Sequence, residues 1–324
     1  MSNAIQTPFD SQLGRNIEAM TDCLASWQPD LDRRAFHARI DAIVEEAHLV
    51  CRRTPTRSLG DEWRTSVHRR FLEAPFIARA FSKPLGYAGD YELMNIIYRN
   101  RPEGETPIGR ALHQWANSFR SACAVRSRRR WVLQQMQDHA RQRDGAYRVL
   151  SLASGPAMEL QDLVRESFLA ERAELLCIDQ DAQSLATAQA EIERAMRETG
   201  RYLPASFSSD SVKRLLLRGG ESQGYGPRDF VYTMGLYDYL PEDVGRKLAT
   251  LLYKMLAPGG RLVIGNFGRQ ADAQAFLDLV CDWHLIYRSA DEVRNLAADV
   301  PADARVDVSL DATGTVYFLV VDKP

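Results

Sequence analysis

The second half of the chain alternates short apolar runs with amphipathic segments, and this alternation limits the possible folds more than any other feature. The apolar runs are YRVLSLA (147–153), ELLCID (174–179), ASFSS (205–209, weaker), DFVYTMG (229–235) and GRLVIGNF (260–267). Helical patterns separate them after Pro156, at 186–198 and at 244–256. Strands that alternate with helices at this spacing predict a mostly parallel, doubly wound sheet.

The last two apolar runs, VDVSL (306–310) and TVYFLVV (315–321), are separated only by DATG. This gap is too short for a helical crossover, so the two runs should form an antiparallel hairpin. A parallel sheet that ends in such a hairpin is the arrangement of class I methyltransferases. We therefore expect an α/β, Rossmann-like fold with a mostly parallel seven-stranded sheet and an antiparallel C-terminal hairpin.

The first half of the chain reads as helical. One helix should begin behind Asp32 as its N-cap, and its apolar positions recur at spacings of three and four: Phe36, Ile40, Ile43, Val44 and Ala47. A second helix should carry Val125, Val132 and Met136. Glycines and prolines break the stretches 58–76 and 83–107 into short pieces. We expect a helical cap domain at 1–140 and a ligand-binding domain at 141–324.

Charge and composition exclude several classes of protein. The net charge is -2 and the basic residues are dispersed, which argues against nucleic-acid binding and favours a small-molecule partner. The sequence contains no apolar run of about 18 residues, so stable membrane insertion is not expected. Residues 1–16 do not resemble a signal peptide, and we therefore expect a cytoplasmic protein. The five cysteines form no CxxC pair and the six histidines no HxH or HExxH, so no metal site is expected.

The first strand runs directly into Ala153-Ser154-Gly155-Pro156-Ala157-Met158. A glycine at such a turn lets the backbone approach a ligand at the N-terminus of the next helix. A dinucleotide fingerprint would place glycines at 153, 155 and 158, and the bulky Met158 counts against it. The methyltransferase pattern acidic-x-G-x-G-x-G keeps only Gly155, although its other marked positions, 151, 153 and 157, hold small residues. A turn that binds no ligand stays open as a third interpretation.

Acidic residues follow the next two strands. The second strand ends in Asp179-Gln180-Asp181, and a carboxylate at that strand end can accept hydrogen bonds from ribose hydroxyls. Asp181 is better interpreted as the N-cap of the following helix. After the third strand, Asp210 precedes Ser211 and could accept from an adenine amino group or simply cap a helix. With Gly235 after the fourth strand, these loops predict a site shaped for a nucleoside.

Several longer strings resemble one bacterial family. They are KPLGYAGDY (83–91), NIIYRN (95–100), AVRSRRR (124–130), LSLASGPA (150–157), GLYDYLP (235–241) and DWHLIYR (282–288). Over roughly residues 60–322 the chain is similar to the class I methyltransferases described as extracellular-factor, or 3-hydroxypalmitic acid methyl ester, biosynthesis proteins. The small-residue loop LASGPA matches that family. The resemblance implies S-adenosyl-L-methionine (SAM) as cofactor and, in the best-known branch, methylation of a 3-hydroxy fatty acid to a quorum-sensing methyl ester.

A carboxylate acceptor is already ionised at neutral pH and needs no general base, so the protein must mainly position it. Hydrogen-bond donors for it could come from residues near the predicted loops: Tyr87, Tyr237, Asn266, Tyr287 and Arg288. Each has a structural alternative. Tyr87 could pack within the cap, Asp238 beside Tyr237 could bond within its own turn, and Arg288 could form a surface ion pair before the capping-box pattern Ser289–Glu292.

Two further features stay open at this point. The run Arg126, Arg128, Arg129 and Arg130 is typical of a solvated helix face, but one member could bind the methionyl carboxylate of SAM. His284 beside Trp283 is more often a satisfied histidine than a base. Competing functions are methylation of a phenol, amine or hydroxamate in secondary metabolism, and a SAM-binding sensor without turnover, which Ala153 and Ala157 would favour.

Overall fold

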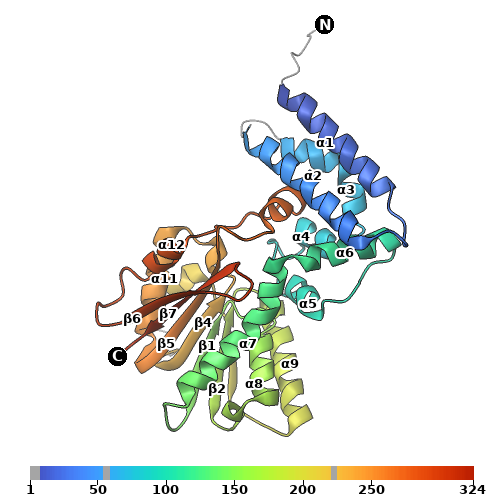
Figure 1. Cartoon of the computed structure of the whole chain (residues 1–324). Coiled ribbons are helices and arrows are strands. Elements are labelled where there is room, and N and C mark those ends of the chain that lie inside the picture. The colour runs from blue at the N-terminus through green and yellow to red at the C-terminus, as the bar shows by residue number, and fades with distance from the viewer. Residues whose placement is uncertain (1–7, 54–58, 220–224) are drawn as a thin grey trace. The chain divides into compact units, whose positions relative to one another are not determined.

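The computed structural model describes residues 8–53, 59–219 and 225–324 (Figure 1). These residues form two compact units. The first contains the chain up to Cys123 and the later segment Asp272–His284, and the second contains Ala124–Ala271 and Leu285–Pro324. The first seven residues, which enter the signal-peptide argument, lie outside the described residues.

The second unit contains one seven-stranded sheet with the order β3-β2-β1-β4-β5-β7-β6. Its strands are β1 (Tyr147–Leu152), β2 (Ala173–Asp179), β3 (Ala205–Ser209), β4 (Arg228–Met234), β5 (Leu256–Phe267), β6 (Arg305–Leu310) and β7 (Val316–Asp322). β1 to β5 are parallel, whereas β7 runs antiparallel to both β5 and β6. The expected sheet and its C-terminal hairpin are confirmed.

Helices cover both faces of this sheet. One face carries α7 (Arg120–Ala140), α8 (Met158–Glu166) and α9 (Ala182–Thr199), and the other α10 (Val212–Arg218), α11 (Glu242–Lys254) and α12 (Ala290–Asn295). Figure 1 shows α7, α8 and α9 on their common side. Alternate strand residues separate between two buried clusters, so that Val149 packs with α7 to α9 and Leu150 with α10 to α12. Burial on both faces explains why the parallel strands read as continuous apolar runs.

The first unit is built from helices. They are α1 (Pro8–Ala25), α2 (Arg33–Arg53), α3 (Leu59–Phe71), α4 (Pro75–Ser82), α5 (Tyr91–Arg99) and α6 (Pro107–Ser118). The helix predicted behind Asp32 is confirmed, because the N–H of Arg34 donates to the Asp32 carboxylate at 2.9 Å and α2 buries all five expected apolar side chains. The expected domain boundary near residue 140 coincides with the end of α7, whereas the compact units divide between Cys123 and Ala124.

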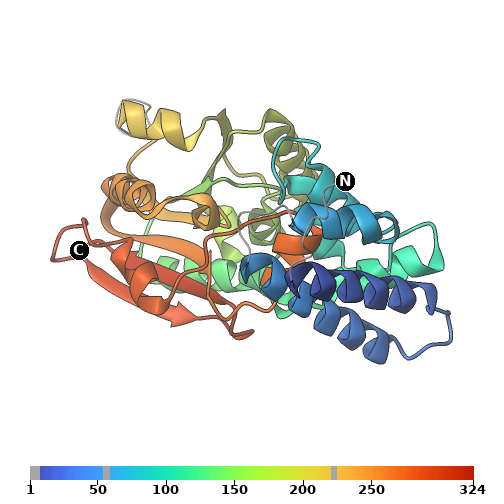
Figure 2. The ribbon, with the colours of Figure 1, turned by 90° about the horizontal axis from the view of Figure 1, so that it is seen from above.

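The segment Asp272–His284 returns to the helical unit and contains η4 (Phe276–Val280), a single π-helical turn. The ring of Phe276 stacks on Phe119 with a centroid distance of 5.0 Å and meets Trp115 edge-on at 4.8 Å. Nε2 of His68 lies 2.7 Å from the carbonyl oxygen of Val280. Figure 2 shows this orange segment among the blue and cyan helices. The helical unit therefore depends on residues that are distant in sequence.

Within the described part of the chain, none of the helices combines the length and hydropathy that crossing a membrane requires.

Candidate functional site

The strand order places a switch point at β1, which lies between β2 and β4. In open α/β sheets, ligands bind outside the carboxyl ends of the strands at such a point. The predicted cofactor residues follow four neighbouring strands: Ala153, Ser154, Gly155 and Pro156 after β1, Asp179 and Gln180 at the end of β2, Asp210 and Ser211 after β3, and Gly235 after β4. The fold thus brings all of them to one edge of the sheet.

The loop after β1 has an unusual backbone. Ala153, Gly155 and Ala157 have φ values of 53°, 52° and 49°, so every second residue is left-handed. These are the positions at which the methyltransferase pattern carries glycine, because a side chain is strained in this region. Alanine occupies two of them because its single methyl group is the smallest departure from glycine. The conformation agrees with the acidic-x-G-x-G-x-G spacing and not with a third glycine at 158, where α8 begins.

Asp179 connects the loops after β1 and β2. The N–H of Gly155 donates to its Oδ2 at 2.9 Å, and the N–H of Asp181 donates to its Oδ1 at 3.0 Å. Burial raises the pKa of the Asp179 carboxyl, although both N–H donors favour its ionised form. A carboxylate oxygen can accept more than one hydrogen bond, so both oxygens of Asp179 keep capacity for ribose hydroxyls. The interpretation of Asp181 as the N-cap of α9 is confirmed, since its carboxylate accepts from Gln183 and Ser184.

Asp210 presents an unsatisfied oxygen at the same edge. Its Oδ1 accepts from the N–H of Ser211 at 2.9 Å and pairs with Nε of Arg214 at 2.8 Å. Its Oδ2 is buried and has no hydrogen-bond partner among the described residues. Ser211, rather than Asp210, is the N-cap of α10. A buried carboxylate oxygen without a partner is rare in proteins and fits a ligand that donates a hydrogen bond.

Arg288 is buried and ties together the ends of β4 and β5. Its Nη1 donates to the carbonyl oxygen of Tyr237 at 2.7 Å and to Oδ1 of Asn266, and its Nη2 donates to the carbonyl oxygen of Leu240 at 2.5 Å. Burial lowers the pKa of its guanidinium. All three acceptors belong to the protein, so the geometry gives Arg288 a positioning role. Its contact with an acceptor carboxylate stays a prediction.

Asp238 and Asn266 complete this buried network. Oδ1 of Asp238 accepts from the N–H of Phe267 at 2.7 Å, and its backbone oxygen accepts from Ile286 at 2.7 Å. Burial raises the pKa of the Asp238 carboxyl to about 6. Nδ2 of Asn266 donates to the carbonyl oxygens of Phe267 and Ile286 at 2.8 and 3.0 Å. The chain that returns at Leu285 is therefore held firmly against this edge.

Tyr237 differs from these neighbours. Its ring is buried beside α11, and burial raises the pKa of its hydroxyl. The hydroxyl oxygen has no hydrogen-bond partner among the described residues. Tyr237 is one of the residues in this unit predicted to donate a hydrogen bond to the substrate carboxylate, and its hydroxyl takes no part in holding the turn.

Other predicted residues belong to the helical unit. Tyr87 lies between Gly86 and Gly89, both of which have positive φ. Asp90, three residues later, is the N-cap of α5 and pairs with Arg79 at 2.7 Å. His284 lies 3.2 Å from the carboxylates of both Asp278 and Asp282, as expected of a satisfied histidine. The predicted contact of Tyr87 with an acceptor stays a prediction.

Sequence reasoning did not identify a buried pair beside the β1 loop. The hydroxyl of Tyr232 on β4 donates to Oε1 of Glu159 at 2.7 Å. Burial raises the pKa of the Glu159 carboxyl, and the bond from Tyr232 opposes this shift. The available signal was a glutamate in the first turn of α8, where the helix dipole favours negative charge.

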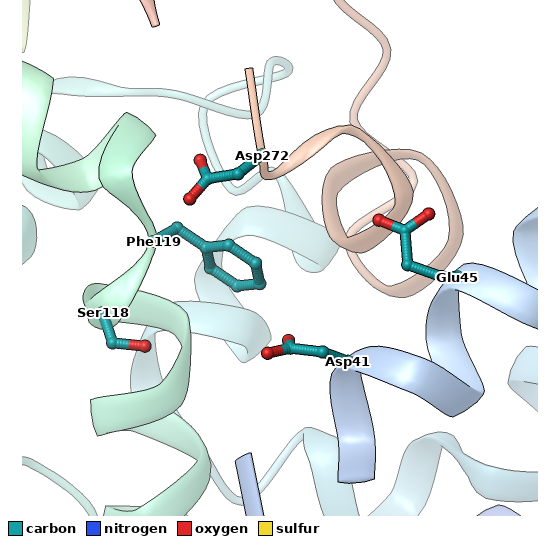
Figure 3. A pocket seen from close by; sticks show the side chains of 5 residues that line it. All are labelled: Asp41, Glu45, Ser118, Phe119 and Asp272. Carbon is teal, nitrogen blue, oxygen red and sulfur yellow. The ribbon is translucent and has the colours of Figure 1, made fainter. Parts of the chain in front are cut away.

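A separate cavity of about 270 Å³ lies within the helical unit and is lined by Asp41, Glu45, Ser118, Phe119 and Asp272 (Figure 3). Two of its carboxylates already have structural tasks. The Asp272 carboxylate accepts from the N–H groups of Arg120 and Ser121 at the start of α7, and that of Asp41 accepts from Trp115 at 2.7 Å. We therefore place the candidate site at the sheet edge.

The chain matches no protein-family model and no curated protein. Among solved structures it is similar to a possible exported protein from Bordetella parapertussis, with a TM-score of 0.56, 15% identity and coverage of 100% of this chain and 99% of that one. It is also similar to magnesium protoporphyrin IX methyltransferase from Synechocystis PCC 6803, with a TM-score of 0.50, 12% identity and coverage of 76% and 98%. The fold is therefore that of a class I methyltransferase.

Proposed function

We propose that this protein is a SAM-dependent methyltransferase whose cofactor binds at the carboxyl edge of the sheet. The observation that carries the proposal is the buried Oδ2 of Asp210, which has no hydrogen-bond partner among the described residues. Asp210 follows β3, and Asp179 ends the neighbouring strand β2. An adenine amino group would satisfy Asp210 while ribose hydroxyls bond to Asp179. The Synechocystis enzyme of the same fold has S-adenosylhomocysteine bound, which supports a nucleoside thioether as ligand.

We further propose that the acceptor is the carboxylate of a 3-hydroxy fatty acid, methylated to a quorum-sensing ester. The resemblance of six sequence strings to the extracellular-factor biosynthesis family supports this choice. Tyr239 and Ile286, which flank the Asp238 turn, are 40% and 38% exposed and offer apolar surface for an acyl chain.

Bound SAM would supply an electrophilic methyl group and a neutral thioether as leaving group. The protein has to hold the acceptor carboxylate in line with that methyl group and exclude water. In our proposal the hydroxyl of Tyr237 donates to the carboxylate, while Asn266 and Arg288 fix the turn that carries Tyr237. No proton moves, because the carboxylate attacks in its ionised form and the ester and thioether are both neutral.

Transfer of a labelled methyl group from SAM to a panel of 3-hydroxy and plain fatty acids, read by mass spectrometry, tests this function. We expect a labelled methyl ester and a preferred chain length. A labelled phenol or amine without any ester would retain the methyltransferase and reject the acid acceptor. SAM binding without transfer to anything in a cell extract would favour a sensor and overturn the enzymatic proposal.

A further inference from the structure

The strand β6 forms one outer edge of the sheet. It is the last strand in the order, so within the described part of the chain only β7 pairs with it. β6 has six residues, contains neither proline nor glycine, and keeps a regular register with β7 along its whole length. An edge of this kind presents a row of backbone N–H and C=O groups to which another strand can bind.

The hydrogen bonds to β7 show which residues of β6 face outward. Directly after the strand, the N–H of Asp311 donates to the carbonyl oxygen of Val316 at 2.9 Å. Hydrogen-bonded pairs alternate along an antiparallel ladder, so the odd-numbered residues of β6 bond to β7. The even-numbered residues therefore direct their N–H and C=O groups away from the sheet; they are Val306, Val308 and Leu310.

A bond from α12 independently supports this direction. Nη1 of Arg294 donates to the carbonyl oxygen of Val306 at 3.0 Å, which requires that oxygen to point away from β7. A carbonyl oxygen has two lone pairs, so it can accept a second hydrogen bond. The same edge also exposes apolar surface, because 46% of Leu310 is accessible to solvent. The edge thus combines backbone hydrogen-bonding groups with an exposed leucine.

We infer that this edge pairs with the β6 edge of a second copy of the chain, in antiparallel orientation about a two-fold axis. Such an interface is self-complementary, because each contact occurs twice. With Val308 on the axis, the two strands overlap completely and Val306 of each copy lies opposite the partner's Leu310. Each outward pair can exchange two backbone hydrogen bonds, which gives about six in all.

The charges of β6 agree with this register. Its odd-numbered residues, Arg305, Asp307 and Ser309, are all exposed. With Val308 on the axis, Asp307 lies opposite the partner's Ser309, whose hydroxyl can donate to it, and Arg305 lies opposite the partner's Asp311. An axis one residue earlier would place Asp307 against its own copy, and like charges directly opposite each other are destabilising.

An axis at Val306 would also bring opposite charges together, since Arg305 would then face the partner's Asp307. That register, however, places Leu310 opposite residue 302, which lies outside the strand. The exposed leucine would remain uncovered and fewer backbone groups would pair. The register centred on Val308 therefore uses the edge most completely.

The mass of the protein in solution tests this pairing. Light scattering and sedimentation velocity between about 1 and 100 μM should show a dimer of twice the chain mass of 36.6 kDa. Ser309→Asp places a carboxylate opposite Asp307 at two symmetric positions, so we expect it to raise the dimer dissociation constant about 10-fold. Adding Asp307→Lys to Ser309→Asp replaces this repulsion by attraction and should restore the original constant to within about threefold.

Two further variants separate this edge from the rest of the molecule. Val308→Pro removes an outward N–H that β7 does not use, and an edge strand tolerates proline at such a position, so we expect a folded monomer by circular dichroism and light scattering. If Val308→Pro does not fold, Ser309→Asp and its restoration by Asp307→Lys decide the question. Ser206→Asp changes an exposed serine on β3, the opposite edge strand, and should leave the dimer unchanged.

A monomer across the whole concentration range would overturn the inference. A dimer that Ser309→Asp does not weaken, or that Ser206→Asp weakens equally, would locate the interface elsewhere and would also overturn it. Because mass is the readout, neither result depends on the proposed methyl transfer.

Discussion

Asp179 and Asp181 are two carboxylates in one loop with different tasks, and substitution should separate them. Asp179→Ala removes the acceptor of the Gly155 N–H and the proposed ribose acceptor, so we expect SAM binding to weaken by about 2 to 3 kcal/mol. Asp181→Ala removes the N-cap of α9 and should cost about 1 kcal/mol of stability with little effect on binding. Calorimetric titration and urea unfolding of both variants measure the difference. Unchanged affinity in Asp179→Ala would remove this residue from the site.

Replacing the left-handed Ala153 by glycine should stabilise the folded protein. A left-handed alanine costs about 1 to 2 kcal/mol, part of which returns as added freedom of the unfolded chain in the glycine variant. We expect Ala153→Gly to raise the free energy of unfolding by about 0.5 kcal/mol, and the β-branched Ala153→Val to lower it by more than about 1 kcal/mol. Urea titration checks both values. A loss of stability in the glycine variant would contradict the strained loop.

Asp238 should make stability depend on pH in a defined window. Its folded pKa of about 6 lies above the ordinary value of 3.8, so between these values the folded state binds more protons than the unfolded state. The stabilisation is complete below about 4 and is lost as the pH rises through about 6. Its magnitude is at most about 3 kcal/mol.

Asp238→Asn keeps an oxygen that can accept from the Phe267 N–H but cannot titrate. Urea unfolding of both proteins between about pH 4 and 7 should therefore give a difference in stability that shifts in favour of the asparagine variant as the pH rises. A constant difference across this range would show that Asp238 does not titrate as its burial requires.

The residues of the proposed cofactor site could be predicted from the sequence because strand ends are local features. Asp179, Asp210 and Gly155 could be placed by counting from apolar runs. The partners of Arg288 could not, since they lie in or directly after η3 (Tyr237–Tyr239) and at the end of β5. The capping-box pattern that follows Arg288 does not indicate which distant carbonyls it contacts. Likewise, the letters of the run 126–130 do not reveal that Arg128 is the buried member.

At the scale of elements, the turn η3 (Tyr237–Tyr239) depends on Arg288. Arg288→Met leaves two carbonyls and Oδ1 of Asn266 without their donor, so we expect a loss of about 2 to 4 kcal/mol in unfolding free energy. Lysine should not rescue it, because one ammonium cannot reproduce the fork of donors. Arg165→Met, which breaks a partly exposed pair with Glu198, serves as control and should cost less than about 1 kcal/mol. An equal loss in the two methionine variants would contradict the assigned role.

The order and type of the elements followed from periodicity, because burial on both faces imposes a distinct pattern on parallel strands. What the pattern could not give is the destination of the segment 272–284. FLDLV in η4 is apolar enough to pack in either unit, and its partners Trp115 and Phe119 are chosen by ring contacts across a long sequence separation. The local sequence therefore does not show in which unit the segment 272–284 packs.

At the scale of the whole molecule, the helical unit should require its distant segment. A fragment of residues 1–123 lacks Phe276, and we expect it to melt at a lower temperature and less cooperatively than the same fragment joined by a short linker to residues 272–284. Burial of a phenylalanine of this kind contributes about 3 to 5 kcal/mol. Circular dichroism melts of the two fragments measure the difference. The joined fragment with Phe276→Ala is the matched control, and equal melting of all three would contradict the dependence.

The interrupted course of the chain also sets the order in which a ribosome can complete the protein. Domains generally fold as units while they are synthesised, N-terminal parts first. Here the N-terminal helices must wait until residues 272–284 have been made, by which time β1 to β5 have already been translated. β7, which separates β5 from β6, is translated after every other strand. A nascent chain that stalls after Ala271 would therefore expose two unfinished cores at once, and both would be clients for chaperones.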